Sequence, residues 1–275
     1  MIECPSVDRR SIRQHYDLAT PFYRLLWGPH IHHGLWEGEC SPADAQRRLI
    51  DRLAAAAAVA RGEAVLDVGC GMGGTAIELA RRWGCSVTGL TLSPVQRFWA
   101  TLSAAWQGAG RRARFLRADA ESVALPPGSF DVVWVVECSE HLFDKPAFFR
   151  RAAGWLRPGG RVALCAWLAG DRPGSEGEVR AVCKGFLCPS LGTAGDYRGW
   201  LAGAGLVNRD FADLTSQVAR TWEVCRRRGR ACGVGLLSWL GGRRMHSFVG
   251  HFATLLGAYR SGAVRYGLFV AGKAS

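Results

Sequence analysis

Short apolar runs alternate with amphipathic stretches through the first 170 residues of the chain. The runs at 63–69, 86–90, 113–119, 130–137 and 161–167 are apolar along most of their length, as strands buried on both faces of a parallel sheet are. Between these runs, apolar positions recur with the period of an α-helix. The alternation predicts an α/β fold built on a doubly wound parallel sheet.

The predicted helices carry start signals. Ser41 and Pro42 place a capping serine and a first-turn proline before a helix over 43–60, and Ser93 and Gln96 have the spacing of a capping box. The helix after Ser93 has one apolar face made of Val95, Phe98, Trp99, Leu102 and Trp106. The helix that begins at Pro146 turns five apolar side chains inward: Phe148, Phe149, Ala152, Trp155 and Leu156.

The alternation stops after Trp167. A loop rich in glycine and proline and irregular helices follow, and a last apolar run at 265–273 predicts a closing strand. We therefore divide the chain into four parts: an N-terminal helical lid (1–60), an α/β core (61–170), a helical cap (171–255) and a C-terminal strand that completes the core sheet (256–275).

Composition narrows the class of protein. The net charge of +12 comes almost wholly from dispersed arginines, with a denser run at 226–230, and no RNA-binding motif accompanies them. The ten cysteines are scattered and form no CxxC, so we expect reduced thiols and no zinc cluster. Because no apolar run approaches about 18 residues and no secretory signal is evident, we expect a cytoplasmic protein. We expect a monomer or homodimer that binds no nucleic acid and makes at most a weak contact with a membrane surface.

The stretch VLDVGCGMGG at 65–74 is the most informative part of the chain. A predicted strand runs directly into Gly69, Gly71 and Gly73, which tolerate positive φ and let a ligand approach the main chain. In an open α/β sheet, ligands bind at the carboxyl ends of the strands, where this loop lies. The loop alone is also compatible with a dinucleotide site. Asp67 can accept a hydrogen bond from an ammonium group or order the loop.

Three segments occur in an order that resembles class I S-adenosylmethionine (SAM) methyltransferases: VLDVGCGMGG at 65–74, RADAESVALPPGSFDVVW at 117–134 and LRPGGRVAL at 156–164. TGLTLSPVQ, ECSEHLFDKPAFF and AYRSGAVRYGLFVAGK are similar to the γ-tocopherol methyltransferase-like group, and more distantly to sterol C-methyltransferases and cyclopropane fatty acid synthases. With these segments the resemblance spans nearly the whole chain. It implies SAM as cofactor and a Rossmann-like sheet of seven strands, mostly parallel, with the last strand antiparallel.

The resemblance also implies which residues hold the cofactor. Asp67, Gly69 and Gly71 would hold the methionine moiety, and Asp119 and Ala120 would flank the adenine. Many relatives have an acidic residue for the ribose hydroxyls where this chain has Thr91, a weaker partner than a carboxylate. The full set of expected cofactor contacts is Asp67, Gly69, Gly71, Gly73, Thr91, Leu92, Gln96, Asp119, Ala120, Glu137 and Tyr16.

Glu137, Glu140 and His141 follow the fourth predicted strand at the ligand-binding edge, and we expect them to be catalytic. A carboxylate and an imidazole there can take a proton from a phenol, an amine or a carbon acid. A structural cap or an ion pair would also explain Glu140.

By resemblance, the segment from His15 to Trp36 folds over the cofactor, and helix packing is the alternative explanation for its aromatic side chains. The expected substrate contacts are Tyr23, Trp27, His32, His33, Trp222, Phe248 and Phe252. The cluster of His30, His32 and His33 suggests a metal, but no cysteine or carboxylate has metal-site spacing, so we expect none.

Together these features predict SAM-dependent methyl transfer to a carbon or nitrogen of a small lipophilic molecule, of isoprenoid, aromatic or alkaloid-like type, in secondary metabolism. Two alternatives stay open from the residues. The pI of 9.7 would suit an RNA methyltransferase, and a non-catalytic scaffold with a methyltransferase fold would keep the same elements.

Overall fold

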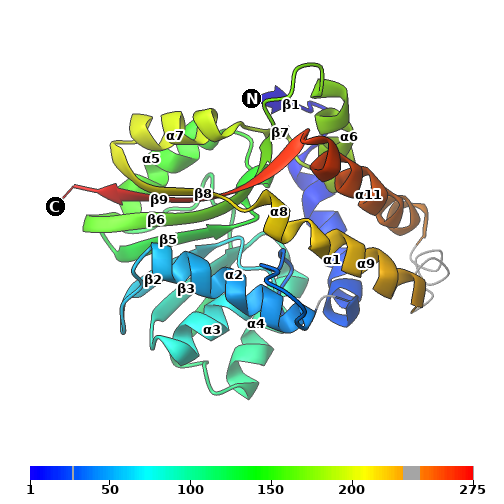
Figure 1. Cartoon of the computed structure of the whole chain (residues 1–275). Coiled ribbons are helices and arrows are strands. Elements are labelled where there is room, and N and C mark those ends of the chain that lie inside the picture. The colour runs from blue at the N-terminus through cyan, green and yellow to red at the C-terminus, as the bar shows by residue number, and fades with distance from the viewer. Residues whose placement is uncertain (27, 232–241, 275) are drawn as a thin grey trace.

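The computed structural model describes residues 1–26, 28–231 and 242–274. At its centre is a seven-stranded sheet in the order β4-β3-β2-β5-β6-β9-β8 (Figure 1). The strands are β2 (Ala64–Val68), β3 (Ser86–Thr91), β4 (Ala113–Arg117), β5 (Phe130–Val136), β6 (Leu156–Ala169), β8 (Leu206–Asp213) and β9 (Val264–Lys273). The first five are parallel, and β9 is antiparallel to both of its neighbours. The predicted fold class is confirmed.

β2 and β5 are neighbours, although β3 and β4 lie between them in the chain. The chain first builds outward from β2 and then returns to its other side, so connections leave the sheet in opposite directions at this point. A crevice opens at the carboxyl ends of strands that diverge in this way. The loop after β2 begins with Gly69 and the loop after β5 with Glu137, so the fold brings both predicted site segments to one place.

Two strands differ from the sequence expectation. The segment Leu206–Asp213, which we placed in the helical cap, forms β8 at the edge of the core sheet. The turn predicted before Arg161 is an irregularity inside β6, because the pairing with β5 shifts from Phe130–Leu156 to Val132–Arg161. Gly159 lies in this shift with a φ of 75°, a conformation that suits glycine.

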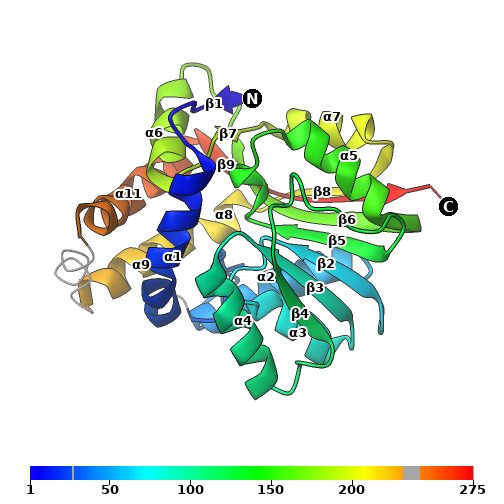
Figure 2. The same cartoon turned by 180° about the vertical axis from the view of Figure 1, so that it is seen from behind.

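Helices cover both faces of the sheet (Figures 1 and 2). One face carries α2 (Pro42–Ala56), α3 (Gly74–Arg82) and α4 (Pro94–Trp106), and the other carries α5 (Lys145–Trp155) and α7 (Ala194–Gly203). The five side chains predicted to face inward from Pro146 onward are all buried, with Leu156 starting β6. Ser41 caps α2 by accepting from Asp44 N, with Pro42 in the first turn, as predicted.

The orientation of α4 corrects the prediction made from its periodicity. Ser93 does cap this helix, since its hydroxyl accepts from Gln96 N, but the Gln96 side chain bonds Thr91 and closes no capping box. The buried positions of α4 are Gln96, Ala100 and Ala104, whereas Phe98, Leu102 and Trp106 are exposed. The small residues let α4 lie close to the sheet. Trp99 of the predicted face is half-buried against the core, whereas Phe98, Leu102 and Trp106 point to solvent.

The remaining elements gather at the carboxyl ends of the strands. They are α1 (Arg9–Leu26), the single turn η1 (Ser139–His141), α6 (Glu176–Phe186), α8 (Thr215–Val218), α9 (Arg220–Ala231), α11 (Gly242–Ser261) and the short antiparallel pair β1 (Ile2–Glu3) and β7 (Ser190–Leu191). Figure 1 shows α1, α6, α9 and α11 as a helical layer beside the sheet. No helix among the described residues is both long and apolar enough to cross a membrane.

Candidate active site

A cavity of about 800 Å³ lies where β2, β3 and β5 end. Helix α1 contributes Ile12 and Tyr16 to its wall, so the N-terminal helix lies over this edge of the sheet. We call it the first cavity. Eight of the expected cofactor contacts line it: Tyr16, Asp67, Gly69, Gly71, Thr91, Leu92, Gln96 and Glu137.

The three loop glycines have different physical roles. All three have positive φ. A Cβ on Gly69 would approach Cys138 Sγ to 2.4 Å, and one on Gly73 would approach Phe115 and Ala100 to under 3.0 Å. Gly71 meets nothing closer than Ile31 Cδ1 at 3.9 Å. Gly69 and Gly73 are therefore required by the packing of the protein itself, and Gly73 does not line the first cavity. Gly71 leaves main chain open to a ligand.

Asp67 is the buried acidic group of this cavity. Its Oδ2 atom has no hydrogen-bond partner among the described residues, and the side chain is 3% exposed. Burial raises the pKa of Asp67 to about 7. An unsatisfied buried carboxylate oxygen is costly. It fits a ligand that carries a positive charge and N–H donors, as an amino acid ammonium does.

Thr91 and Gln96 form a polar corner of the first cavity. The Thr91 hydroxyl donates to Gln96 Oε1 at 2.8 Å and accepts from Ser93 N at 3.2 Å. Ser93 in turn donates to Asp17 of α1, which ties the helix over the site to the end of β3. The corner holds polar groups where the resemblance places the ribose, although it lacks a carboxylate.

The expected adenine contacts lie outside the first cavity. Asp119 pairs with Arg9 at 3.1 Å and accepts from Glu121 N, and Ala120 is buried in the core. Asp119 lines an adjacent groove that also contains Arg10, Arg13 and Arg117. Leu92 lines both the groove and the first cavity, so Asp119 lies at the margin of the site.

A second cavity, of about 570 Å³, lies against the first. Its wall is mostly aromatic and includes Tyr23, Trp167, Phe186 and Trp222. The two cavities share five wall residues: Tyr16, Ile31, His32, Glu137 and His141. Segments from α1, the 30–33 loop and the end of β5 thus form one boundary between two ligand-sized spaces.

Glu137 is the fixed negative charge of this boundary. Oε1 accepts from His33 N and from the Tyr266 hydroxyl, each at 2.7 Å, and Oε2 accepts from His33 Nδ1 at 2.9 Å and Trp167 Nε1 at 3.1 Å. Burial alone would raise its pKa, but the His33 interactions outweigh burial and lower the pKa of Glu137 to about 2. Its φ of 50° shows that the main chain is strained to hold it there.

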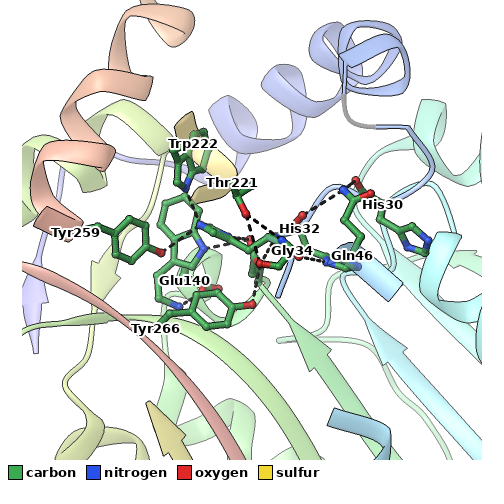
Figure 3. Close-up of polar contacts among 12 residues, drawn as sticks. His30, His32, Gly34, Gln46, Glu140, Thr221, Trp222, Tyr259 and Tyr266 are labelled. Carbon is green, nitrogen blue, oxygen red and sulfur yellow. Dashed lines mark hydrogen bonds and ion pairs between the residues drawn. The ribbon is translucent and has the colours of Figure 1, made fainter. Parts of the chain in front are cut away.

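His33 connects the carboxylate to the helical layer. Trp222 Nε1 donates to His33 Nε2 at 2.6 Å, and the Tyr259 hydroxyl lies 3.2 Å from the same atom (Figure 3). Because Nε2 accepts from the indole N–H, Nδ1 carries the proton and donates to Glu137. His33 is 1% exposed. It orients Glu137, and its second nitrogen is already occupied.

His141 and Tyr16 form a hydrogen-bonded pair at the same boundary. The Tyr16 hydroxyl lies 2.8 Å from His141 Nε2, and His141 Nδ1 lies 3.0 Å from the Leu187 carbonyl oxygen. Burial lowers the pKa of His141 to about 4, so the imidazole is neutral near pH 7. A carbonyl can only accept, so Nδ1 donates to Leu187 and Nε2 accepts from Tyr16.

Glu140 is held in its neutral form. Burial raises its pKa to about 8, and its Oε1 accepts from Trp167 N. Glu140 lines the second cavity and not the first. A protonated carboxyl near pH 7 donates a hydrogen bond, so Glu140 differs in charge from Glu137 although both are buried carboxyls.

The other expected substrate contacts have varied positions. Tyr23, His32, His33 and Trp222 line the second cavity, whereas Phe252 packs behind Trp222 with ring centroids 5.2 Å apart. Trp27 and the Phe248 side chain lie outside the described residues. Sequence reasoning did not identify Trp167, Phe186, Tyr259 and Tyr266. Trp167 lies near the carboxyl end of the apolar run of β6, close to the edge at which Glu137 follows β5, a signal that was available.

The histidines do not form a metal-binding group. His32 donates from Nδ1 to the His33 carbonyl at 2.7 Å, and its Nε2 has no partner among the described side chains. Across the ranges the structure describes, no three His, Cys, Asp or Glu side chains are arranged to hold an ion.

Comparison with known proteins agrees with this geometry. The family model described as mycolic acid cyclopropane synthetase matches residues 5–179. Tocopherol O-methyltransferase of Arabidopsis thaliana is 31% identical over 96% of this chain and 82% of its own, and the 27-O-demethylrifamycin SV methyltransferase of Amycolatopsis mediterranei is 35% identical over 78% and 79%.

Solved structures show the same fold. The [4+2]-cyclase SpnF superposes with a TM-score of 0.83 at 26% identity, over 96% of this chain and 95% of that one. The mycolic acid cyclopropane synthase CmaA1, complexed with SAH (S-adenosylhomocysteine), gives 0.86 at 21% identity, over 96% and 98%.

The doubly wound sheet, the glycine loop with Asp67 and these relatives define a SAM-dependent methyltransferase. The chain belongs to the mycolic acid cyclopropane synthetase family and is related to the tocopherol methyltransferases. The cofactor is SAM. The first cavity fits it, with Asp67 available for the ammonium group and Gly71 for close approach of the main chain.

Replacing Asp67 by Asn tests the ammonium site. In the ligand-free protein Asp67 titrates near pH 7, whereas in the unfolded chain it titrates near 3.8, so it makes folding less favourable as pH rises between these values. Asn removes that cost, on the order of 2–4 kcal/mol. We expect Asp67→Asn to raise Tm at pH 8 by about 5 °C or more, with little change at pH 4, and to weaken SAM binding about 100-fold.

Thermal melts at both pH values and calorimetric titration of SAM measure these effects. Asp131→Asn is the control, because Asp131 is an acidic residue beside the same strand that pairs with Arg157 outside both cavities. If Asp67→Asn bound SAM as tightly as the wild type, Asp67 would not be a contact of the SAM ammonium group.

Proposed function

We propose that the enzyme transfers the methyl group of SAM to a carbon or nitrogen atom of a small lipophilic acceptor held in the second cavity. The observation that carries the proposal is the boundary of five residues shared by the two cavities. A donor in one space and an acceptor in the other would meet there. Such positioning is most of what a methyl transfer requires of a protein.

The lining of the second cavity supports a lipophilic acceptor. Tyr23, Trp167, Phe186 and Trp222 surround much of the space with rings, and the polar groups, among them Glu137, Glu140 and His141, lie at defined positions between them. Trp167, Phe186 and Trp222 also pack edge to face on one another, with centroids 5.2–6.0 Å apart, so the wall is rigid. Relatives named for tocopherol and for a rifamycin derivative agree with an isoprenoid, aromatic or alkaloid-like acceptor of secondary metabolism.

The charges at the boundary favour an acceptor that becomes positive during the reaction. When bound, SAM supplies an electrophilic methyl group on a cationic sulfonium. With its pKa lowered to about 2, Glu137 is negatively charged near pH 7, and its four hydrogen bonds fix its position. A preorganised carboxylate stabilises positive charge that develops on an amine nitrogen or on the carbon skeleton of an alkene. The same carboxylate would repel the negative charge of a phenolate acceptor.

Proton removal falls to a different group. Both Glu137 oxygens are occupied and its pKa is near 2, so it is a poor base. We assign the role of base to the pair of Tyr16 and His141. The tyrosine oxygen takes a proton from the methylated substrate while its own proton passes to His141 Nε2. This transfer leaves an imidazolium that donates to the Leu187 carbonyl. A base this weak suits a strongly acidic proton, such as one beside a carbocation.

Glu140 and His32 would contact the acceptor. Neutral Glu140 can donate a hydrogen bond into the second cavity, and His32 Nε2 can accept one at the boundary.

Nine cysteines in the described ranges are unpaired, which agrees with a reducing compartment such as the cytoplasm.

The test is transfer of a labelled methyl group from SAM into a metabolite extract and, separately, into total RNA. We expect label in the organic-soluble products, with the methyl group on carbon or nitrogen by NMR. Tyr16→Phe should lower the rate about 100-fold, whereas Tyr197→Phe, a buried tyrosine bonded to Ser139 outside both cavities, should not. Label in RNA alone, or on a phenolic oxygen, would contradict the proposal.

A further inference from the structure

The outer face of α4 is unusually apolar for a helix in contact with solvent. Phe98, Leu102 and Trp106 are 63%, 46% and 88% exposed. Their spacing of four residues aligns them along one side of the helix. We call these three residues the α4 stripe. Figure 2 shows α4 on the outside of the molecule, next to α1. Three large apolar side chains exposed along one side of a helix are typical of a surface that contacts a protein, a membrane or a ligand.

Positive charge is concentrated in the segment of the chain that carries the stripe. From Pro94 to Arg117 the chain has five arginines and no aspartate or glutamate: Arg97, Arg111, Arg112, Arg114 and Arg117. None of the five makes an ion pair with a described residue, and those on β4 and the preceding loop are exposed. Arg97 instead donates to the Phe115 carbonyl.

The charge continues onto α1. Arg9, Arg10 and Arg13 share a groove with Arg117 and Leu92, and Leu92 also belongs to the first cavity. The acidic residue of this groove, Asp119, pairs with Arg9, so the other three arginines leave the groove positively charged. Ser93, at the start of α4, donates to Asp17 of α1. The stripe therefore lies next to a basic region formed by α1, α4 and β4, and α1 is also the helix that lines the active site.

We propose that the stripe and this basic region dock the enzyme on an anionic lipid surface. Apolar side chains along one helix, with tryptophan at its end and arginines beside them, have the composition of helices that lie in the membrane interface. Arginine side chains reach anionic head groups while the stripe enters the acyl boundary. A second copy of the chain is a poor occupant, because two faces with the same arginines would repel one another.

Docking of this kind would give the active site access to molecules dissolved in the bilayer. Since α1 contributes to the basic groove and to the walls of both cavities, the lipid surface would lie beside a helix that lines the active site. The inference goes beyond the proposed function, and lipid binding is measured without any methyl transfer.

Cosedimentation with vesicles tests the inference. We expect the wild type to pellet with vesicles of equal parts phosphatidylcholine and phosphatidylglycerol, to remain free with phosphatidylcholine alone, and to be released by high salt. The variant Phe98→Ser, Leu102→Ser, Trp106→Ser should bind at least about tenfold more weakly. Because all three side chains are exposed, SAM should still raise the Tm of this variant, which shows that it is folded.

The matched control is Val207→Ser, which removes a 64% exposed apolar side chain on β8 at the opposite edge of the sheet and should leave vesicle binding unchanged. Two results would overturn the inference: equal vesicle binding by the wild type and the stripe variant, or a wild-type dimer in sedimentation that the stripe variant loses while neither binds vesicles.

Discussion

Replacing Gly71 by Arg should abolish SAM binding and leave the protein folded. A Cβ at this position meets only Ile31 Cδ1 at 3.9 Å, so a long side chain would extend into the first cavity without displacing the core. Gly71 has a φ of 53°, and a side chain there costs about 1–2 kcal/mol in backbone strain. We expect no heat of binding and no rise in Tm with millimolar SAM.

Gly128→Arg separates strain from obstruction. Gly128 has a φ of 61°, a Cβ added to it would have no atom within 4 Å, and it lies in the turn before β5, away from both cavities. Its Arg variant should lose a similar amount of stability and keep wild-type affinity for SAM. If Gly71→Arg bound SAM as Gly128→Arg does, the cofactor would not lie against the 69–74 loop.

The second large effect is expected for Glu137→Gln. The amide removes the negative charge and turns one acceptor atom into a donor that faces N–H groups of His33 or Trp167. His33 cannot easily change tautomer, because its Nε2 accepts from Trp222. We expect kcat to fall about 100- to 1,000-fold, and stability to fall by about 1–3 kcal/mol from the unsatisfied donors.

Glu63→Gln is the matched control. Glu63 accepts two charged hydrogen bonds from Arg161, at 2.7 Å each, on the far side of the core from the cavities. Its Gln variant should lose stability and retain kcat. Equal losses of kcat in the two variants would mean that Glu137 acts only through the fold.

Sequence patterns predicted those parts of the candidate site whose position follows from the order of residues along a strand and the loop after it. An apolar run that enters glycines and an apolar run that enters Glu137 both end at the same sheet edge, because parallel strands present their carboxyl ends together. Asp67, Gly71 and Glu137 could therefore be placed in one cavity without knowing any side-chain contact.

Long-range partners could not be predicted in this way. Tyr266 reaches Glu137 only because β9 runs antiparallel to β6 and pairs Tyr266 with Trp167, a register that no local pattern specifies. Trp222 and Tyr259 meet His33 from helices far along the chain. β8 was missed because its mixed sequence, LVNRDFAD, carries the polar residues of an edge strand instead of an apolar run.

Helix periodicity predicted an apolar face for α4 but not whether that face points toward the sheet or toward solvent. Both the stripe with Phe98 and the strip with Ala100 and Ala104 have helical spacing, and the sequence interpretation named only the face with the larger apolar side chains. In the fold, close packing on the sheet selects the alanines. The error is informative, since the exposed stripe is a surface that function, not folding, explains.

A crystal structure with S-adenosylhomocysteine would test most directly whether donor and acceptor meet across the shared boundary. We predict the product in the first cavity, its ammonium group bonded to Asp67 and its sulfur facing the boundary of Tyr16, Glu137 and His141, with the second cavity open beyond it. A product bound in the second cavity, or with its sulfur turned away from that boundary, would contradict the account.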